Sequence, residues 1–235
     1  MPKANYNELL SSIPFYQKHW EMIPFVGREY ESSIHRKLLI VGESHYMPEG
    51  SKIHHDVSQW YGENPGMSPD ERRFCDTRGA REGKSGRFGV EIERCLKQVY
   101  SFNENAWQQV ASINYFLRPA DNKQNVENLW DKYGGKEVDC EKAIRNFIKV
   151  IEILKPDLFV FASWLVCNQA EHQDFPHIFG GNLWDWTATN GVSDYIYVNH
   201  PSSPHWNSPM TKYFKAKDLT SREFFCKWLR ENWLK

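Results

Sequence analysis

Hydrophobic residues along the chain fall into two patterns. Short apolar runs bounded by polar residues are typical of buried parallel strands, and apolar positions three and four residues apart are typical of helices with one buried face. The short runs predict strands at 37–41, 110–116, 158–161 and 195–198. The longer patterns predict helices at 90–100, 136–154, 164–170 and 218–234, preceded by short helices over 5–30.

The alternation of these strands and helices predicts the fold class. Strand–helix repeats favour a parallel sheet that is covered by helices on both faces. We therefore expect one three-layer α/β/α domain over residues 1–235, with a central four-stranded parallel sheet. Residues 1–36 would form an N-terminal helical extension. Residues 47–87, which are polar and rich in Gly, Pro and Arg, would form a long variable loop.

Polar residues follow three of the four predicted strands. Residues 42–46 (Gly-Glu-Ser-His-Tyr) follow the first strand, Asn114 ends the second, and residues 200–203 (His-Pro-Ser-Ser) follow the fourth. Ligands bind outside the carboxyl ends of the strands in sheets of this kind. Because these ends share one edge of the sheet, we expect the three segments to lie together.

The segment after the first strand contains titratable side chains. Gly42 permits a tight turn in which backbone amides can approach a ligand. Glu43 and His45 can transfer protons or hold a water molecule. The alternative interpretation is an ordinary strand exit with its polar side chains in solvent.

The other segments offer recognition chemistry. The Asn114 amide presents a donor and an acceptor side by side, which suits the reading of a base edge, although turn formation is the alternative. His200 directly follows a buried strand, which favours a functional role over a purely structural hydrogen bond. Ser202 and Ser203 can contact phosphate. Phe88 can stack on a planar ligand, although a core position is the commoner fate of a phenylalanine.

Charge and cysteine content limit the partners. The formal net charge is −1, so a nucleic-acid partner needs a local basic surface. The five cysteines are scattered and include no Cys-x-x-Cys pair, which predicts reduced thiols, a cytoplasmic location and no iron–sulfur cluster. No apolar run is long enough to span a membrane, so we expect no membrane partner. The most basic stretch contains Arg72, Arg73, Arg78, Arg81, Lys84 and Arg87.

One short motif contains metal-ligating residue types. His54, His55 and Asp56 are consecutive, but no third ligand follows at helical spacing. The sequence also has no glycine-rich nucleotide-binding fingerprint, Walker loop or zinc-protease motif. We therefore expect neither a metal nor a cofactor.

Taken in order, these segments resemble the uracil-DNA glycosylase superfamily. Its first motif, G-x-(D/N/A)-P after the first strand, is similar to residues 42–46, and its H-P-S-(P/S) motif is similar to residues 200–203. Phe88 resembles the family's base-stacking Phe, and Asn114 resembles the Asn that reads the pyrimidine edge. The resemblance covers residues 37–210. It implies a base-flipping DNA-repair hydrolase that cleaves an N-glycosidic bond.

The resemblance also implies roles for individual residues. Phe88 would stack on the flipped base, Asn114 would hydrogen-bond its edge, and His200 would stabilise charge on the departing base. Glu43, with Ser44 or His45, would position the attacking water. The remaining contacts to the substrate would come from Gly42, Tyr46, Ser202 and Ser203.

The sequence departs from the family at two positions and leaves alternatives open. His45 stands where the family usually has Pro, and Ser44 stands where active branches often have Asp or Asn. The leading hypothesis is a monomeric DNA glycosylase-like hydrolase that needs no cofactor and acts on DNA, including single-stranded DNA. The alternatives are a catalytically silent module that binds nucleotides or single-stranded nucleic acid, and a hydrolase of free nucleosides or nucleotides.

Overall fold

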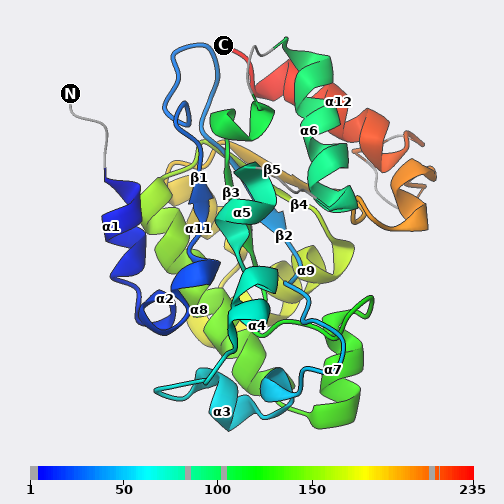
Figure 1. Ribbon diagram of the computed structural model, residues 1–235. Helices are drawn as coiled ribbons and strands as arrows, with labels where there is room; N and C mark the ends of the chain where they lie inside the picture. The colour runs from blue at the N-terminus through cyan, green and yellow to red at the C-terminus, as the bar shows by residue number, and fades with distance from the viewer. Residues whose placement is uncertain (1–4, 83–85, 102–104, 212–214, 217) are drawn as a thin grey trace.

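The computed structural model describes residues 5–82, 86–101, 105–211, 215–216 and 218–235 (Figure 1). Lys84 of the basic stretch lies outside these ranges. The described residues form a sheet with helices on both faces, so the predicted α/β class is confirmed. No helix among them has the length and apolar character that a membrane crossing requires.

The sheet has five strands, not the four expected. The strands are β1 (Phe25–Val26), β2 (Leu38–Gly42), β3 (Ala111–Asn114), β4 (Leu158–Phe161) and β5 (Asp194–Tyr197). Their order is β1-β3-β2-β4-β5. The last four strands are parallel, whereas β1 pairs antiparallel with β3, so the sheet is mixed.

The additional strand lies in the segment that was expected to be wholly helical. Phe25 and Val26 stand between Pro24 and Gly27, and two residues are too few to show an alternating strand pattern. Phe25 pairs with Ser112 and Val26 with Ala111. The strand therefore depends on its partner in the sheet, and the local sequence alone does not identify it.

The described residues form twelve α-helices. They are α1 (Tyr6–Ser11), α2 (Pro14–Lys18), α3 (Val57–Tyr61), α4 (Pro69–Phe74), α5 (Thr77–Glu82), α6 (Arg87–Val99), α7 (Val126–Tyr133), α8 (Lys136–Leu154), α9 (Trp164–Asn168), α10 (Phe175–Phe179), α11 (Leu183–Thr189) and α12 (Ser221–Asn232). Short 3-10 turns occupy Trp20–Met22, Ile53–His55, Ala106–Gln109 and Pro204–Asn207, and a π-helical turn occupies Gln169–Asp174. The predicted bounds of the long helix 136–154 and of the strand 158–161 are confirmed.

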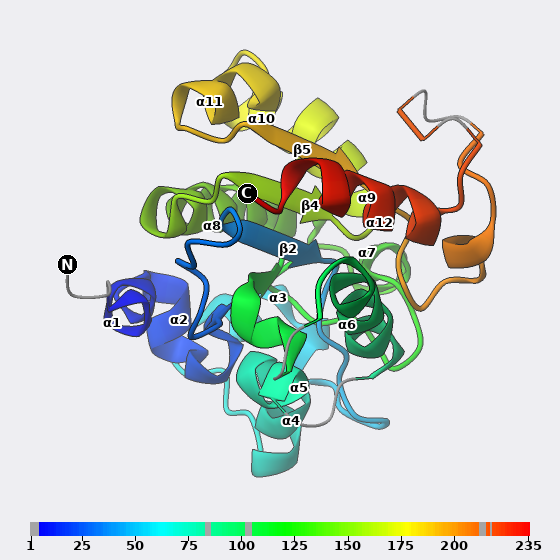
Figure 2. The same cartoon turned by 90° about the horizontal axis from the view of Figure 1, so that it is seen from above.

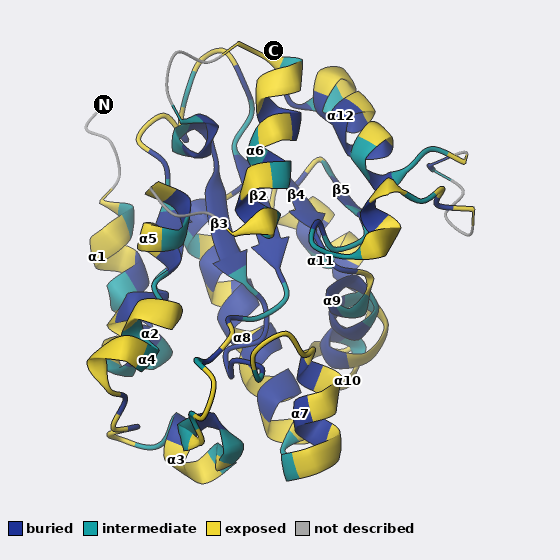
Figure 3. Cartoon of the chain, turned by 45° about the vertical axis from the view of Figure 1, so that its right-hand side comes forward, coloured by how far each residue is buried: buried dark blue, intermediate teal, exposed yellow. Residues whose placement is uncertain are grey.

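Alternate residues of each central strand face two separate cores. Leu39 and Val41 of β2 pack into the core that α8 covers, whereas Leu38 and Ile40 pack into the core that α6 and α12 cover. Figure 2 shows α1, α2 and α8 on one side of the sheet and α6 and α12 on the other. Because both faces are covered, the strands are buried along most of their length (Figure 3).

The segment 47–87, expected as a long loop, contains three short α-helices and a 3-10 turn. Ser68 and Glu71 form a capping box at the start of α4, and the Asp56 side chain accepts a hydrogen bond from the Gln59 amide at the start of α3. These helices have five or six residues each. That is too short for a hydrophobic period to be visible, so their caps are the local signal of helix formation.

Candidate functional site

The order of the strands reverses at the carboxyl ends of β2 and β4. From β2 the chain adds β3 on one side and then crosses back to add β4 on the other. Ligands of open α/β sheets bind at such reversal points. Glu43 directly follows β2, and Ser163 lies two residues after the end of β4. The Ser163 hydroxyl donates a 2.8 Å hydrogen bond to Glu43 Oε2, which joins the two strand ends.

Gly42 brings two predicted recognition residues together. It is in register with Asn114 of the neighbouring strand β3. A Cβ atom at position 42 would lie 2.4 Å from Asn114 Oδ1 and 3.4 Å from Phe88 Cζ. The missing side chain of Gly42 therefore leaves the space that the Asn114 amide occupies, beside the edge of the Phe88 ring.

His200 packs against the same phenylalanine. The ring centroids of Phe88 and His200 are 5.3 Å apart, with an angle of 37° between the planes. The Ser202 amide donates a 3.2 Å hydrogen bond to His200 Nδ1, so a neutral ring carries its proton on Nε2. Burial lowers the pKa of His200 to about 4. Near neutral pH the residue therefore presents a neutral Nε2–H donor.

The serines after His200 have structural contacts. The Ser203 amide donates to the His200 carbonyl at 2.8 Å, and the Ser203 hydroxyl accepts from the His205 amide at 3.1 Å. Together with the bond from Ser202 to the imidazole, these contacts fix the turn and the orientation of His200. Phosphate contact by Ser202 and Ser203 remains a prediction.

Glu43 is a largely buried carboxyl group. Burial raises its pKa, and the hydrogen bonds from Ser163 and from the Val126 backbone lower it in part, while nearby Glu127 raises it further. The Glu43 carbonyl accepts from the Phe116 amide at 2.9 Å, so its backbone continues the pairing of β2 with the chain after β3. A carboxyl group of raised pKa at a strand end is suited to proton transfer.

The three residues after Glu43 differ in their surroundings. The His45 ring is buried, and its Nε2 lies 3.1 Å from the Thr77 hydroxyl of α5. Burial, and to a lesser extent Arg81, lower the His45 pKa to about 3, so this residue is a neutral packing group. Ser44 is half-buried, with no hydrogen-bond partner for its hydroxyl in the described part of the chain. Tyr46 is 38% exposed, and burial of its ring together with nearby Glu43 raises its pKa.

Arg81 is buried against two aromatic rings, a position that the sequence did not indicate. Its guanidinium lies 4.9 Å from the Phe88 ring centroid and 4.5 Å from that of Trp107, and its Nε donates to the Ser112 hydroxyl at 3.1 Å. The side chain is buried, and no carboxylate pairs with it among the described residues. Burial lowers its pKa to about 10, so the group is cationic at neutral pH. A buried positive charge therefore lies directly beside Phe88.

Two of the other arginines of the basic stretch have partners within the protein. Arg72 is paired with the buried Glu21 at 2.9 Å, and Arg78 donates to the Asn7 side chain at 3.2 Å. Arg73 and Arg87 are exposed. Phosphate contact by the exposed arginines remains a prediction.

One group of metal-ligating side chains is present among the described residues, and it differs from the sequence motif. His54 and His55 converge on Asp121, 66 residues further along the chain from His55. Asp56 caps α3 instead. The search for a third ligand at helical spacing missed Asp121 because it comes from the chain after β3.

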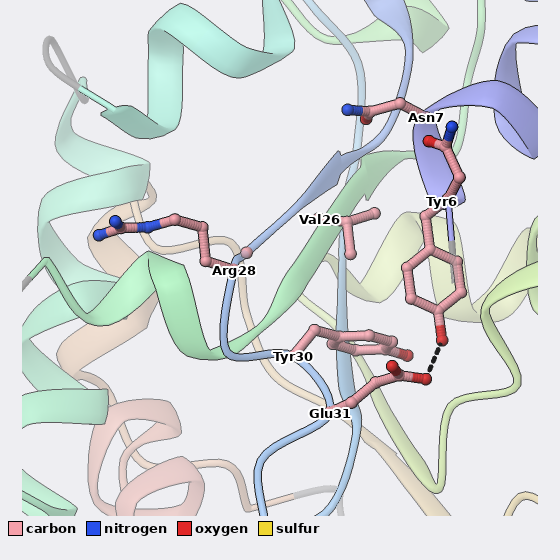
Figure 4. Close-up of a pocket in the computed structure, with 8 residues that line it drawn as sticks. Tyr6, Asn7, Val26, Arg28, Tyr30 and Glu31 are labelled. Atoms are coloured by element: carbon pink, nitrogen blue, oxygen red, sulfur yellow. Dashed lines mark hydrogen bonds between the residues drawn. The ribbon is translucent and has the colours of Figure 1, made fainter. Parts of the chain in front are cut away.

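A separate cavity of about 160 Å³ lies between α1 and the turn after β1 (Figure 4). The Tyr6 hydroxyl donates a 2.6 Å hydrogen bond to Glu31 across it, and Val26 and Tyr30 also line it. None of the strand-end residues described above lines this cavity. It is therefore distinct from the candidate site.

We refer to Gly42, Glu43, Phe88, Asn114, Ser163 and His200 as the strand-end site. Five of its members were singled out from the sequence as site residues: Gly42, Glu43, Phe88, Asn114 and His200. Ser163 was missed, although it too follows a buried strand. No protein-family model matches this chain, and no curated protein matches it.

Proposed function

We propose that the protein is a DNA glycosylase-like hydrolase that removes a deaminated or modified base through the strand-end site. The observation that carries the proposal is that Asn114 and Phe88 both lie beside Gly42 and that His200 packs against Phe88. A stacking ring, an amide and a neutral imidazole donor are the groups needed to bind a flipped base and stabilise its departure. Their order along the chain is that of the uracil-DNA glycosylase superfamily.

In this proposal Phe88 and Asn114 recognise the base. The base stacks on the Phe88 ring, and the Asn114 amide hydrogen-bonds its edge. Gly42 is required because any side chain there would displace Asn114. The rigid register between β2 and β3 fixes the amide relative to the stacking ring, which is the positioning that base reading needs.

His200 acts on the leaving group. Cleavage of the N-glycosidic bond leaves the bonding electron pair on the base, which departs with negative charge. The neutral Nε2–H of His200 donates a hydrogen bond to the developing anion, and the cationic Arg81 beside Phe88 adds a favourable electrostatic potential. Both effects are strong because the groups are buried and need little reorganisation.

Glu43 acts on the nucleophile. Its carboxylate accepts a proton from water while the water oxygen forms a bond to the anomeric carbon, and that proton finally reaches the departing base. The hydrogen bonds from Ser163 and from the Val126 backbone hold the carboxylate in place for this proton transfer. Glu43 takes the place of the Asp or Asn of other branches, and Ser44 does not serve as the base because its hydroxyl is not basic near neutral pH.

A labelled oligonucleotide panel tests this proposal. Single- and double-stranded substrates with uracil, hypoxanthine, xanthine or a mismatched thymine are incubated with the protein and treated with alkali, which cleaves at abasic sites. We expect cleavage of at least one substrate, a loss of about 10²-fold or more in His200→Ala, and near-normal activity in His205→Ala. The exposed His205, five residues further on, is the matched control.

The other outcomes distinguish the alternatives. Binding of the oligonucleotides without an abasic product from any substrate would overturn the enzyme proposal and favour a silent binding module. Release of free base from nucleosides or nucleotides, but not from oligonucleotides, would identify a hydrolase of small substrates. Equal activity of His200→Ala and the wild type would remove the strand-end site from the mechanism.

A further inference from the structure

His54, His55 and Asp121 present three ligand atoms to one point. His54 Nε2 lies 2.8 Å and His55 Nε2 2.9 Å from the same carboxylate oxygen, Asp121 Oδ1. All three ligand atoms lie within 4.8 Å of one another. The two histidines come from the 3-10 turn Ile53–His55, and the aspartate comes from the chain after β3. The fold therefore builds this group from two distant segments.

The surroundings hold the ligands in place. The His55 ring stacks on Tyr133 with centroids 3.7 Å apart and an angle of 14°. Arg118 NH1 donates to the His54 carbonyl at 3.2 Å, which ties the turn to the chain before Asp121. The His54 side chain is fully buried, whereas those of His55 and Asp121 are 19% and 20% exposed. An ion can therefore reach the group from the side of His55 and Asp121.

The local charge suits a cation. The buried Arg118 is neutralised by Asp139, to which its Nε and NH2 donate at 2.6 to 3.1 Å. Glu71 lies close enough to His54 to interact electrostatically, and Asp121 adds a second carboxylate. The exposed Lys132 contributes one positive charge near Asp121. The group therefore carries a net negative charge when both histidines are neutral.

The ligand set selects the type of ion. Two imidazole nitrogens and one carboxylate oxygen suit Zn²⁺ and similar first-row ions, whereas Mg²⁺ and Ca²⁺ prefer oxygen ligands alone. Tetrahedral Zn²⁺ with bonds of about 2.0 to 2.2 Å separates its ligands by roughly 3.3 Å. The nitrogen–oxygen distances here need to expand by only about 0.5 Å to reach that separation.

We propose that His54, His55 and Asp121 form a binding site for a divalent transition-metal ion of the zinc type. The ion is bound through both Nε2 atoms and Asp121, and a water molecule on the exposed side completes the coordination. This site is separate from the strand-end site, although both are built by the chain leaving β2 and β3. The proposal does not depend on the glycosylase hypothesis.

Metal titration of the untagged, chelator-treated full chain tests this inference. Co²⁺ reports on nitrogen coordination through its visible absorption, and Zn²⁺ affinity is measured by calorimetry and by competition with a chromogenic chelator. We expect one Zn²⁺ per chain and displacement of bound Co²⁺ by Zn²⁺. We expect His55→Ala and Asp121→Asn each to weaken Zn²⁺ binding by about 100-fold, because each removes one of three protein ligands.

His177→Ala is the matched control, because His177 is exposed and lies outside the group. It should bind Zn²⁺ as the wild type does. Circular dichroism checks that each variant is folded, and the partial exposure of His55 and Asp121 favours retention of the fold. The proposal is overturned if the wild type fails to bind Zn²⁺ at micromolar concentrations, or if His55→Ala and Asp121→Asn bind as tightly as His177→Ala. In either case the three residues form only a hydrogen-bonded cluster.

Discussion

Gly42→Ala is the most selective test of the strand-end site. The substitution adds one methyl group at the end of β2 and changes no charge. The backbone φ of Gly42 is outside the left-handed region, so alanine fits the main chain. The only close obstacle is Asn114 Oδ1, 2.4 Å from the position of the new Cβ, while Phe88 Cζ at 3.4 Å is in ordinary contact.

The structure sets the size of the effect. To restore ordinary contact at 3.4 Å, the Asn114 oxygen has to move by about 1 Å. Moving this short side chain off its preferred rotamer costs about 0.5 to 1.5 kcal/mol, which lowers Tm by roughly 1 to 6 °C in a chain of this size. A misplacement of about 1 Å in a group that positions substrate can cost on the order of 100-fold in rate. We therefore expect a large functional loss with a small loss of stability.

Two measurements follow these effects separately. Single-turnover base release is measured on the best substrate of the oligonucleotide panel, and Tm is measured by calorimetry. NMR of the side-chain amide of Asn114, assigned by its disappearance in Asn114→Ala, reports the displacement without any assumption about function. We expect the Asn114 amide resonances to shift in Gly42→Ala.

Gly86→Ala makes the same chemical change as a control. Among the described residues, no atom lies within 4 Å of a Cβ at position 86, and the backbone φ of −63° is accessible to alanine. Its Asn114 resonances and its rate should stay close to those of the wild type. Unchanged Asn114 resonances in Gly42→Ala would refute the packing argument. Shifted resonances with full activity would refute the role of Asn114 in recognition.

Three further predictions concern buried charges. Glu43→Gln should raise Tm near pH 7, because burial raises the Glu43 pKa and disfavours its charged form. Thermal melts should show that this gain disappears as the pH falls below about 4.5, where the carboxyl group is protonated in both the folded and the unfolded state. The same variant should lose base-release activity, and wild-type activity should decline as acid protonates Glu43. Arg118→Met should lower the free energy of unfolding, measured with denaturant, by about 3 to 5 kcal/mol because it leaves the buried Asp139 without its cationic partner. Arg145→Met, at an exposed ion pair, should lower it by about 0.5 kcal/mol or less. Arg81→Met should keep the fold and slow base release by about 10- to 100-fold, and an unchanged rate would show that this cation does not assist the reaction.

Long, strongly patterned elements were predictable from the sequence. The helix 136–154 has apolar residues at helical spacing over five turns, and the strand 158–161 is a continuous apolar run. Short elements were not predictable in this way. β1 has two residues, and α7 has eight that follow no long periodic pattern, so both depend on contacts with distant parts of the chain. Local capping signals identify where such helices start, as Asn125 does for α7.

The sequence also predicted only some features of the candidate site. Residues at strand ends could be selected from sequence because parallel strands deliver their carboxyl ends to one edge, and this rule selected Glu43, Asn114 and His200. Applied to β4, the rule would also have found Ser163. It could not show that His45, two residues after Glu43, turns toward Thr77 and becomes buried. The direction of a side chain in an irregular segment depends on what packs against it.

The sequence by itself determined the alternation of strands and helices and the chemical character of the strand ends, because hydrophobic period and turn residues are local properties. Only the tertiary structure decided which side chains meet. Asn114 occupies the space left by Gly42, the Arg81 guanidinium lies beside the Phe88 ring, and Asp121 joins two histidines more than 60 residues away. These contacts follow from strand order and register. Those are set by the packing of the whole core, and no single segment encodes them.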